Sequence, residues 1–179
     1  TIGRGNNMEE DQILAESLMD SHKEREEHSL VREQILRKLH PVINNIQYSP
    51  LPQIMKLKNV QHLHTPISGK LKVDINVLDL VSRLHPTSAV AGTPTPEAME
   101  VIQEMEKHDR GWYSGPIGWL DEKGDGEFYV ALRSALVRDE EAHVFAGGGI
   151  VSESYPDKEW DETELKLQPI MSALSGGQI

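Results

Sequence analysis

The stretch from residue 8 to residue 39 is rich in Glu, Leu, Met, Gln and Lys, all strong helix formers. Ser21, His22, Lys23 and Glu24 resemble a capping box, which predicts one helix over about residues 9–20 and a second over residues 22–39. Pro41 ends the second helix. The sequence therefore predicts two consecutive helices in the first quarter of the chain.

The middle of the chain mixes strand and helix signals. Residues 59–73 alternate and are β-branched, which predicts a strand with a bend near Pro66 to Gly69. Asp74 is placed to cap a short helix that runs through Leu84. Residues 85–96 are rich in turn formers, and Thr95 with Pro96 opens a further helix through about Lys107.

The pattern changes from Gly111 onward. Residues 111–120, 127–137 and 142–151 indicate a three-stranded antiparallel meander. Ser154 and Pro156 then start a last helix, which stops at Gly176 and Gly177. Helices combined with antiparallel strands place the chain in the α+β class.

Composition excludes several kinds of function. The chain has no cysteine, which rules out disulfides, thiolate metal sites and cysteine nucleophiles, and is consistent with a cytoplasmic protein. The net charge of −11 argues against nucleic acid as a partner, because phosphate binding needs a concentrated basic surface. A small anionic substrate would need a local cation or a metal ion. With 179 residues the chain could fill one domain, but its start at Thr1, without methionine, suggests a fragment.

Two pairs of glutamates are candidates for a metal site. Glu24 and Glu27 lie near the apolar stripe of the second helix, and Glu159 and Glu162 share a face of the last helix with Lys166. Helix geometry alone favours a capping role for Glu24, a position at the edge of the stripe for Glu27, and a solvated salt-bridge ladder for the second pair. Two such pairs could nevertheless clamp Mg²⁺, which prefers oxygen ligands.

The meander offers an anion site. On the strand 127–137, Arg133 shares a face with Ala131 and Ala135, which leaves room for a planar carboxylate against the guanidinium. Residues Gly147, Gly148 and Gly149 could expose consecutive backbone N–H groups to an anion, although a plain turn explains them equally well. His62 and His64 point to one face of a strand, more often as structural groups than as zinc ligands. Tyr113, in the strand Trp112–Gly115, is by itself more typical of a core.

Seven segments, taken together, resemble the chorismate-binding enzyme family. They run in family order over nearly the whole chain: KEREEHSLV (23–31), VQHL (60–63), LHPTSAVAGTP (84–94), RGWYSGPIGW (110–119), ALRSAL (131–136), AGGGIVSESYP (146–156) and EWDETELK (159–166). The resemblance implies about half of a four-layer α/β/β/α sandwich with antiparallel sheets. Residues 1–179 would be the C-terminal portion of one chorismate-binding domain whose N-terminal half is absent.

The resemblance also assigns roles to residues. It implies Mg²⁺ as cofactor, with Glu27 and Glu162 as ligands and Glu24 and Glu159 assisting through water. It implies chorismate as substrate, with the carboxylates held by Tyr113, Arg133, Gly147, Gly148, Gly149 and Lys166. His62 would line the pocket near the ring, and Thr1 matches the threonine of the family's Ala-Gly-Thr segment.

Ala89 bears on which reaction the family resemblance implies. Members that eliminate pyruvate, such as salicylate and anthranilate synthases, usually carry threonine at this position, whereas alanine resembles isochorismate synthases. The segments RGWYSGPIGW and EWDETELK are more similar to isochorismate synthases of the menaquinone pathway than to those of siderophore pathways. The general acid and base of the family lie upstream of Thr1, so a chain of these 179 residues is expected to be inactive. A pyruvate-releasing relative and a non-catalytic anion-binding module remain the alternatives.

Overall fold

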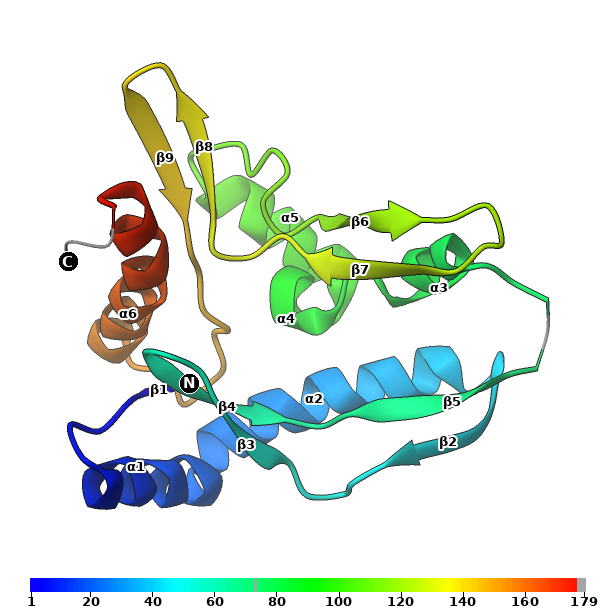
Figure 1. Ribbon diagram of the computed structural model, residues 1–179, viewed down its shortest axis with the longest axis horizontal. Coiled ribbons are helices and arrows are strands. Elements are labelled where there is room, and N and C mark those ends of the chain that lie inside the picture. Colours follow the sequence, from blue (N-terminus) through cyan, green and yellow to red (C-terminus); the bar gives the residue numbers. More distant parts are fainter. Residues whose placement is uncertain (73, 177–179) are drawn as a thin grey trace. The chain divides into compact units, whose positions relative to one another are not determined.

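The computed structural model describes residues 1–72 and 74–176, which form helices and short antiparallel strands (Figure 1). They divide into two compact units. Unit 1 comprises Thr1–His28, Leu51–His64 and the chain from Leu132 onward, and unit 2 comprises Ser29–Pro50 and Thr65–Ala131. Among the described residues, no helix is both long and apolar enough to cross a bilayer.

Unit 1 contains a three-stranded antiparallel sheet in the order β1 (Ile2–Gly3), β4 (Val60–His64) and β3 (Gln53–Lys56). Helix α1 (Met8–Asp20) contacts β1 and β4, and the helix follows the blue strand β1 in Figure 1. Its buried side chains Ala15 and Leu18, together with Val60 of β4, form the apolar centre of this part. The central strand β4 thus pairs with β1 on one edge and with β3 on the other, and it also contacts α1.

Asp11 fixes α1 to the sheet through buried polar contacts. Its carboxylate accepts hydrogen bonds from Arg4 Nε at 2.6 Å and Lys56 Nζ at 2.7 Å. The fully buried Gln61 donates to its carbonyl oxygen at 3.0 Å. Hydrogen bonds from Arg4 and Lys56 lower the pKa of Asp11. A buried carboxylate is tolerated here because each oxygen has a cationic partner.

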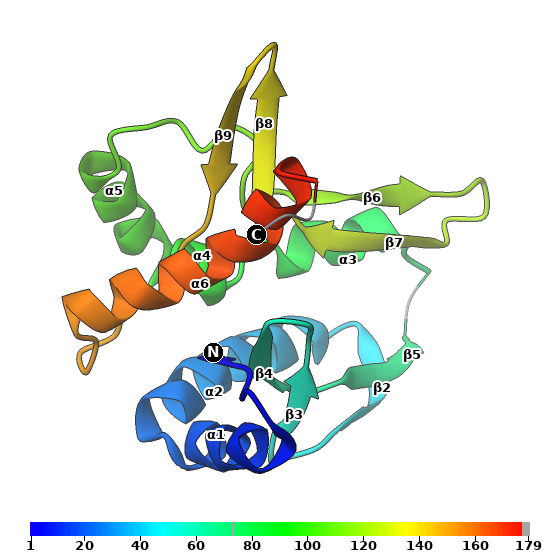
Figure 2. The same ribbon diagram turned by 60° about the vertical axis from the view of Figure 1, so that its left-hand side comes forward.

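The rest of unit 1 comes from the end of the chain. Strands β8 (Ser134–Arg138) and β9 (Glu141–Phe145) form an antiparallel hairpin, and helix α6 (Pro156–Leu174) contacts β9 (Figure 2). The first two turns of helix α2 (His22–Leu39) also belong to unit 1. Both helices that carry the candidate glutamates thus supply them to the same unit.

Unit 2 combines the remainder of α2 with two strand pairs and three helices. Strands β2 (Ile43–Tyr48) and β5 (Ile67–Leu71) pair antiparallel, as do β6 (Pro116–Leu120) and β7 (Gly126–Val130). Helix α3 (Val77–Leu84) contacts β6 and β7. Helices α4 (Ser88–Ala91) and α5 (Thr95–Met105) contact each other.

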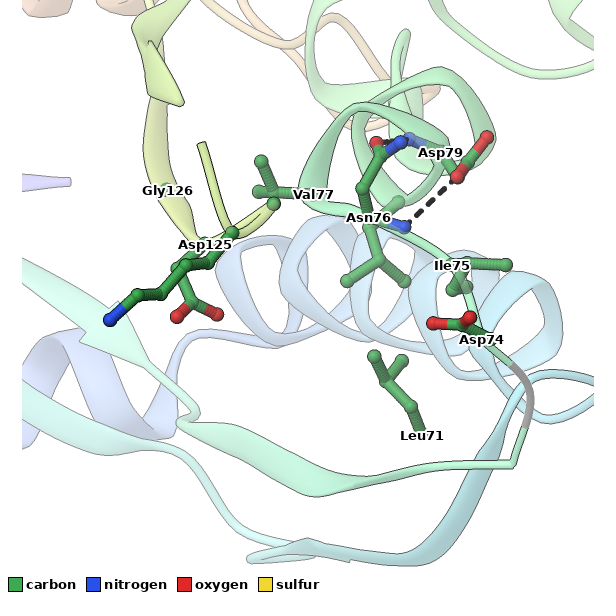
Figure 3. Close-up of a pocket in the computed structure, with 11 residues that line it drawn as sticks. Leu71, Asp74, Ile75, Asn76, Val77, Asp79, Asp125 and Gly126 are labelled. Atoms are coloured by element: carbon green, nitrogen blue, oxygen red, sulfur yellow. Dashed lines mark hydrogen bonds between the residues drawn. The ribbon is translucent and has the colours of Figure 1, made fainter. Parts of the chain in front are cut away.

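A pocket of about 460 Å³ in unit 2 lies where α3 begins (Figure 3). It is lined by Leu71, by the first residues of α3 and by the β6–β7 turn at Lys123 to Gly126. Asn76 forms a capping box with Asp79: its side chain accepts from the Asp79 N–H, and its own N–H donates to the Asp79 carboxylate. None of the residues predicted to bind substrate or metal lines this pocket.

The two helices at the start of the chain are confirmed almost to the residue. The single strand predicted over residues 59–73 is instead two strands of different sheets, β4 and β5. The break between them, at Thr65 and Pro66, falls at the start of the predicted bend, and Gly69 lies within β5. The end of the predicted strand, at Val73, lies outside the described residues. The predicted cap of α3 is wrong, since Asn76 and not Asp74 provides it. The last helix starts at Pro156 as expected and ends at Leu174, before Gly176 with φ +69°; Gly177 lies outside the described residues.

The three-stranded meander is wrong. The structure contains two separate hairpins, and the predicted middle strand 127–137 is interrupted between Val130 and Ser134. Arg133 sits in this break with φ +49°, a left-handed conformation that a continuous strand excludes. Apolar residues lie on both sides of the break, which is why the sequence pattern alone could not detect it.

Candidate functional site

Four glutamates converge in unit 1 from the N-terminal turns of two helices. Glu24 and Glu27 follow the start of α2, and Glu159 and Glu162 follow Pro156 at the start of α6. The i, i+3 spacing puts the members of each pair on one face of their helix. Lys23 lies among them: its ammonium group donates a short hydrogen bond to Glu159 Oε1 and lies 3.4 Å from Glu27 Oε1 and 4.0 Å from Glu24 Oε1.

The cluster has more negative than positive charge. Lys166 Nζ pairs with Glu162 Oε1 at 2.6 Å, so two lysine side chains face four carboxylates. The main-chain nitrogen of Thr1 donates a further hydrogen bond to Glu24. Glu159 Oε2 is nevertheless buried without a hydrogen-bond donor, and Glu27 Oε1 is buried without a hydrogen bond, with the Lys23 ammonium group 3.4 Å away. Buried oxygens of this kind are costly unless a cation satisfies them.

Proton affinities in the cluster follow from burial and charge. Burial raises the pKa of Glu27, and the neighbouring charges of Glu24 and Glu162 add to this, against the effect of Lys23. Burial also acts to raise the pKa of Glu162, but the hydrogen bond and charge of Lys166 outweigh it, and the pKa is lowered. Burial acts to lower the pKa of Lys23, yet its carboxylate neighbours raise it overall. Lys23 is therefore a permanent cation at neutral pH.

The donor set fits Mg²⁺. It consists of hard carboxylate oxygens, it has an excess of two negative charges over the two lysines, and two buried oxygens have no hydrogen bond. The oxygens are spread around the lysines instead of being drawn together. Of the described residues, only the exposed group His22, Glu26 and Glu153 brings three possible ligand atoms within 4.8 Å of one another.

The triple glycine lies directly against the carboxylates. A Cβ on Gly149 would lie 3.1 Å from Glu27 Oε2, and a Cβ on Gly148 would lie 3.4 Å from Glu159 Oε2. The carbonyl oxygen of Gly147 accepts from Lys166 Nζ at 3.1 Å. A side chain at position 149 would push the Glu27 carboxylate aside slightly, whereas one at position 148 would make ordinary contact with Glu159. The segment Gly147 to Gly149, which was expected to bind an anion, thus also forms one side of the acidic cluster.

His62 links two other predicted site residues. Thr1 Oγ1 lies 2.9 Å from Nδ1, and Arg133 Nη2 lies 2.8 Å from Nε2. A guanidinium only donates, so Nε2 must accept, and the proton of the neutral ring must be on Nδ1 and donated to Thr1. Burial and then the charge of Arg133 lower the pKa of His62 to about 4. The ring is neutral at physiological pH.

Tyr113 and Ala89 lie in unit 2, whereas the other predicted site residues lie in unit 1. Tyr113 is not on a strand as expected but in the turn that precedes β6. Burial raises its pKa. Nearby Arg110 donates to the carboxylate of Glu106 at 2.7 Å and to the carbonyl of Val90 at 2.8 Å, which ties this turn to α4 and α5. Ala89 lies in α4, a short helix that the turn-rich composition of residues 85–96 concealed.

Lys23 is the residue of this cluster that the sequence did not single out. It immediately precedes Glu24, and it lies four residues before Glu27, a spacing that brings side chains together on a helix. This spacing could have predicted the contact of Lys23 with Glu27. No sequence pattern could have predicted its contact with Glu159, which is 136 residues away along the chain.

Comparison with known proteins identifies the class. A family model described as "Chorismate binding enzyme" matches residues 1–175. The chain belongs to the chorismate-binding enzyme family, and its mixture of helices and antiparallel strands is about half of the chorismate-utilising fold. The α+β prediction and the family resemblance are thereby confirmed.

Several relatives are named isochorismate synthases. The chain is 42% identical to isochorismate synthase MenF of Bacillus subtilis and 45% identical to the salicylate biosynthesis isochorismate synthase of Pseudomonas aeruginosa; each match covers 98% of this chain and 37% of the relative. A crystal structure of a putative 2,3-dihydroxybenzoate-specific isochorismate synthase, DhbC from Bacillus anthracis, matches with a TM-score of 0.93 at 38% identity, over 97% of this chain and 46% of that one. The chain therefore spans less than half the length of these relatives.

Proposed function

We propose that the complete protein containing this chain is an Mg²⁺-dependent isochorismate synthase. It would convert chorismate to isochorismate by adding water at C2 while hydroxide leaves C4, with the ring double bonds shifting between them. The observation that carries the proposal is the convergence of Glu24, Glu27, Glu159 and Glu162 in one unit, with two buried oxygens lacking a hydrogen bond. The similarity to proteins named isochorismate synthases supports the choice of reaction.

The metal would be held by Glu27 and Glu162, with Glu24 and Glu159 assisting through water. When bound, Mg²⁺ would orient the ring carboxylate of chorismate and offset its negative charge. The donor set supports this assignment, because it provides oxygen ligands and an excess of two negative charges.

Chorismate carries two carboxylates, and the chain offers cations for them. Arg133 presents a planar guanidinium that can fork onto a carboxylate, and Lys166 and Tyr113 are assigned to the same task. The hydrogen bond from Lys166 Nζ to the Gly147 carbonyl oxygen supports the proposal that Lys166 and the triple glycine act at one carboxylate. His62 would lie near the ring as a neutral group, because its lowered pKa keeps the imidazole uncharged.

The reaction also needs a base to take a proton from the attacking water and an acid to protonate the leaving hydroxide. We assign both to the part of the protein that precedes this chain. The menaquinone pathway and a cytoplasmic location are further parts of the proposal; similarity to MenF proteins of Bacillus subtilis and Mycobacterium tuberculosis supports the former.

The test is incubation of the complete protein with chorismate, with and without Mg²⁺, followed by chromatography of the products and an assay for pyruvate. Isochorismate that forms only with Mg²⁺, without stoichiometric pyruvate, is the expected result. Pyruvate in equal amount to consumed chorismate would identify a lyase instead. Binding of chorismate without turnover would identify a non-catalytic module.

A further inference from the structure

Lys23 is the centre of the charge network that joins the two glutamate pairs. Its side chain is 20% exposed and its ammonium group is within 4.0 Å of oxygens from three of the four glutamates. Two of these, Glu24 and Glu27, belong to its own helix, and the third, Glu159, belongs to α6. A lysine in this position draws α2 and α6 together by its charge alone.

Lys23 engages oxygens of Glu27, a proposed direct ligand of the metal, and of Glu159, proposed to assist through water. Glu159 Oε1 accepts its hydrogen bond, and Glu27 Oε1 lies 3.4 Å from its nitrogen. A lysine ammonium group occupies the space next to each oxygen to which it donates. A metal ion therefore cannot approach that oxygen from the same side. Two cations within a few ångströms in a partly buried site also repel each other strongly.

Resting on the proposed Mg²⁺ site, we propose that Lys23 is the internal counter-ion of the metal-free site, and that Mg²⁺ displaces its ammonium group from Glu27 and Glu159. The lysine keeps the carboxylates of Glu24, Glu27 and Glu159 together when no metal is bound. It also competes with the metal for their oxygens, and so sets how much Mg²⁺ is needed to fill the site.

The proposal predicts opposite effects on stability and on metal affinity. Without metal, removing Lys23 leaves the glutamates to repel one another, so the protein becomes less stable. With metal, the same change removes the competitor, so Mg²⁺ binds more tightly. If Lys23 instead supported the bound metal ion, both quantities would fall together.

The experiment uses the complete protein with Lys23→Met, which keeps most of the length and apolar character of the side chain. Lys23→Arg keeps the cation, and Lys158→Met is the matched control. Lys158 is on α6 directly beside Glu159, but its ammonium group lies over the ring of Tyr155, at 5.3 Å from the ring centre. Calorimetric titration gives the Kd for Mg²⁺, and thermal unfolding gives Tm in EDTA and at saturating Mg²⁺.

Lys23→Met is expected to lower Tm in EDTA and to bind Mg²⁺ about tenfold more tightly, or about 1.4 kcal/mol. Lys23→Arg should bind Mg²⁺ no more tightly than the wild type, and Lys158→Met should match the wild type in both measurements. Mg²⁺ affinity that is unchanged or weaker in Lys23→Met overturns the role of Lys23. If Lys23→Met does not fold in EDTA, the Lys23→Arg variant decides the question. Tighter Mg²⁺ binding by this variant than by the wild type would also overturn the role of Lys23, because arginine keeps the competing cation. Absence of Mg²⁺ binding by the wild type overturns the metal site and the counter-ion together.

Discussion

Lys166 Nζ lies 2.6 Å from Glu162 Oε1 and 3.1 Å from the carbonyl oxygen of Gly147, so a residue assigned to the substrate is paired with one assigned to the metal. The pair has i, i+4 spacing on α6. Because one cation serves both the carboxylate and the glycine segment, a change at Glu162 should affect metal binding and the position of Lys166 together.

Glu162→Gln should weaken Mg²⁺ binding by at least about tenfold, because a neutral amide replaces a charged oxygen ligand. Calorimetry with Mg²⁺ on the complete protein, together with the Mg²⁺ dependence of kcat/KM, measures the effect. Glu164→Gln is the matched control, since Glu164 is an exposed residue on the same helix. Wild-type activity at low Mg²⁺ in the Glu162 variant would contradict the assignment.

Arg133→Lys should lower kcat/KM for chorismate by roughly ten- to a hundred-fold, which corresponds to the loss of about 1.5–3 kcal/mol from a charge-assisted hydrogen bond. Lysine keeps the charge but loses the fork geometry, and it also loses the contact of Nη2 with His62. Steady-state kinetics of folded protein test this, with Arg138→Lys at the end of β8 as the control. Unchanged kcat/KM would remove Arg133 from the substrate site.

Ala89→Thr should raise the yield of pyruvate relative to isochorismate, if the hydroxyl group at this position determines the type of reaction. Ala89→Val separates this from size, because valine has nearly the shape of threonine without the hydroxyl. The two products are quantified after complete consumption of chorismate. Equal product ratios in the threonine and valine variants would show that the discrimination lies elsewhere.

His62 should make the complete protein less stable as the pH falls from about 6.5 to about 4. Its pKa is lowered in the folded state, so the unfolded chain binds the proton more readily throughout this range, and stability rises with pH across it. The contribution has a ceiling of about 3 kcal/mol, since one pKa unit corresponds to about 1.4 kcal/mol. Urea unfolding at pH 7 and pH 5 would show a smaller difference for His62→Gln than for the wild type. The same difference in both proteins would contradict the buried neutral ring.

A protein of these 179 residues alone should not turn over chorismate. It spans 37–46% of its relatives, and the β6–β7 hairpin leaves Ile117, Trp119 and Tyr129 between 57% and 62% exposed. Apolar side chains in such a patch normally contact further protein. An assay for isochorismate in the presence of Mg²⁺ tests this, and turnover within tenfold of the complete protein would show that the assignment of acid and base to the preceding part is wrong.

Local signals in the sequence predicted the helices well and the strands only in part. Strong helix formers and Pro41 were enough to define α1 and α2. The short strands β2 and β3 were not anticipated, because strands of four to six residues carry little periodicity. The break at Arg133 was not predicted for a different reason: the backbone conformation of one residue interrupts the strand, while apolar residues continue on both sides of it.

The sequence predicted which residues belong to the candidate site but not how they are arranged in space. Helix spacing paired Glu24 with Glu27 and Glu159 with Glu162, but only the family resemblance brought the pairs together. Sequence could not show that Lys23 would lie between them or that the backbone of Gly148 and Gly149 would close against them. Such contacts depend on side-chain positions between distant segments, for which spacing along the chain contains no information.

Unit 1 is assembled from three separate stretches of chain, and the contact between Lys23 and Glu159 spans 136 residues. Closing a loop of this length costs conformational entropy before any contact can compensate, which makes pairings between distant segments late events in folding. The acidic cluster therefore cannot exist in a nascent or partly folded chain that lacks α6. A divalent ion would bind only the folded unit 1. Its binding would therefore stabilise the native state without promoting the early steps of folding.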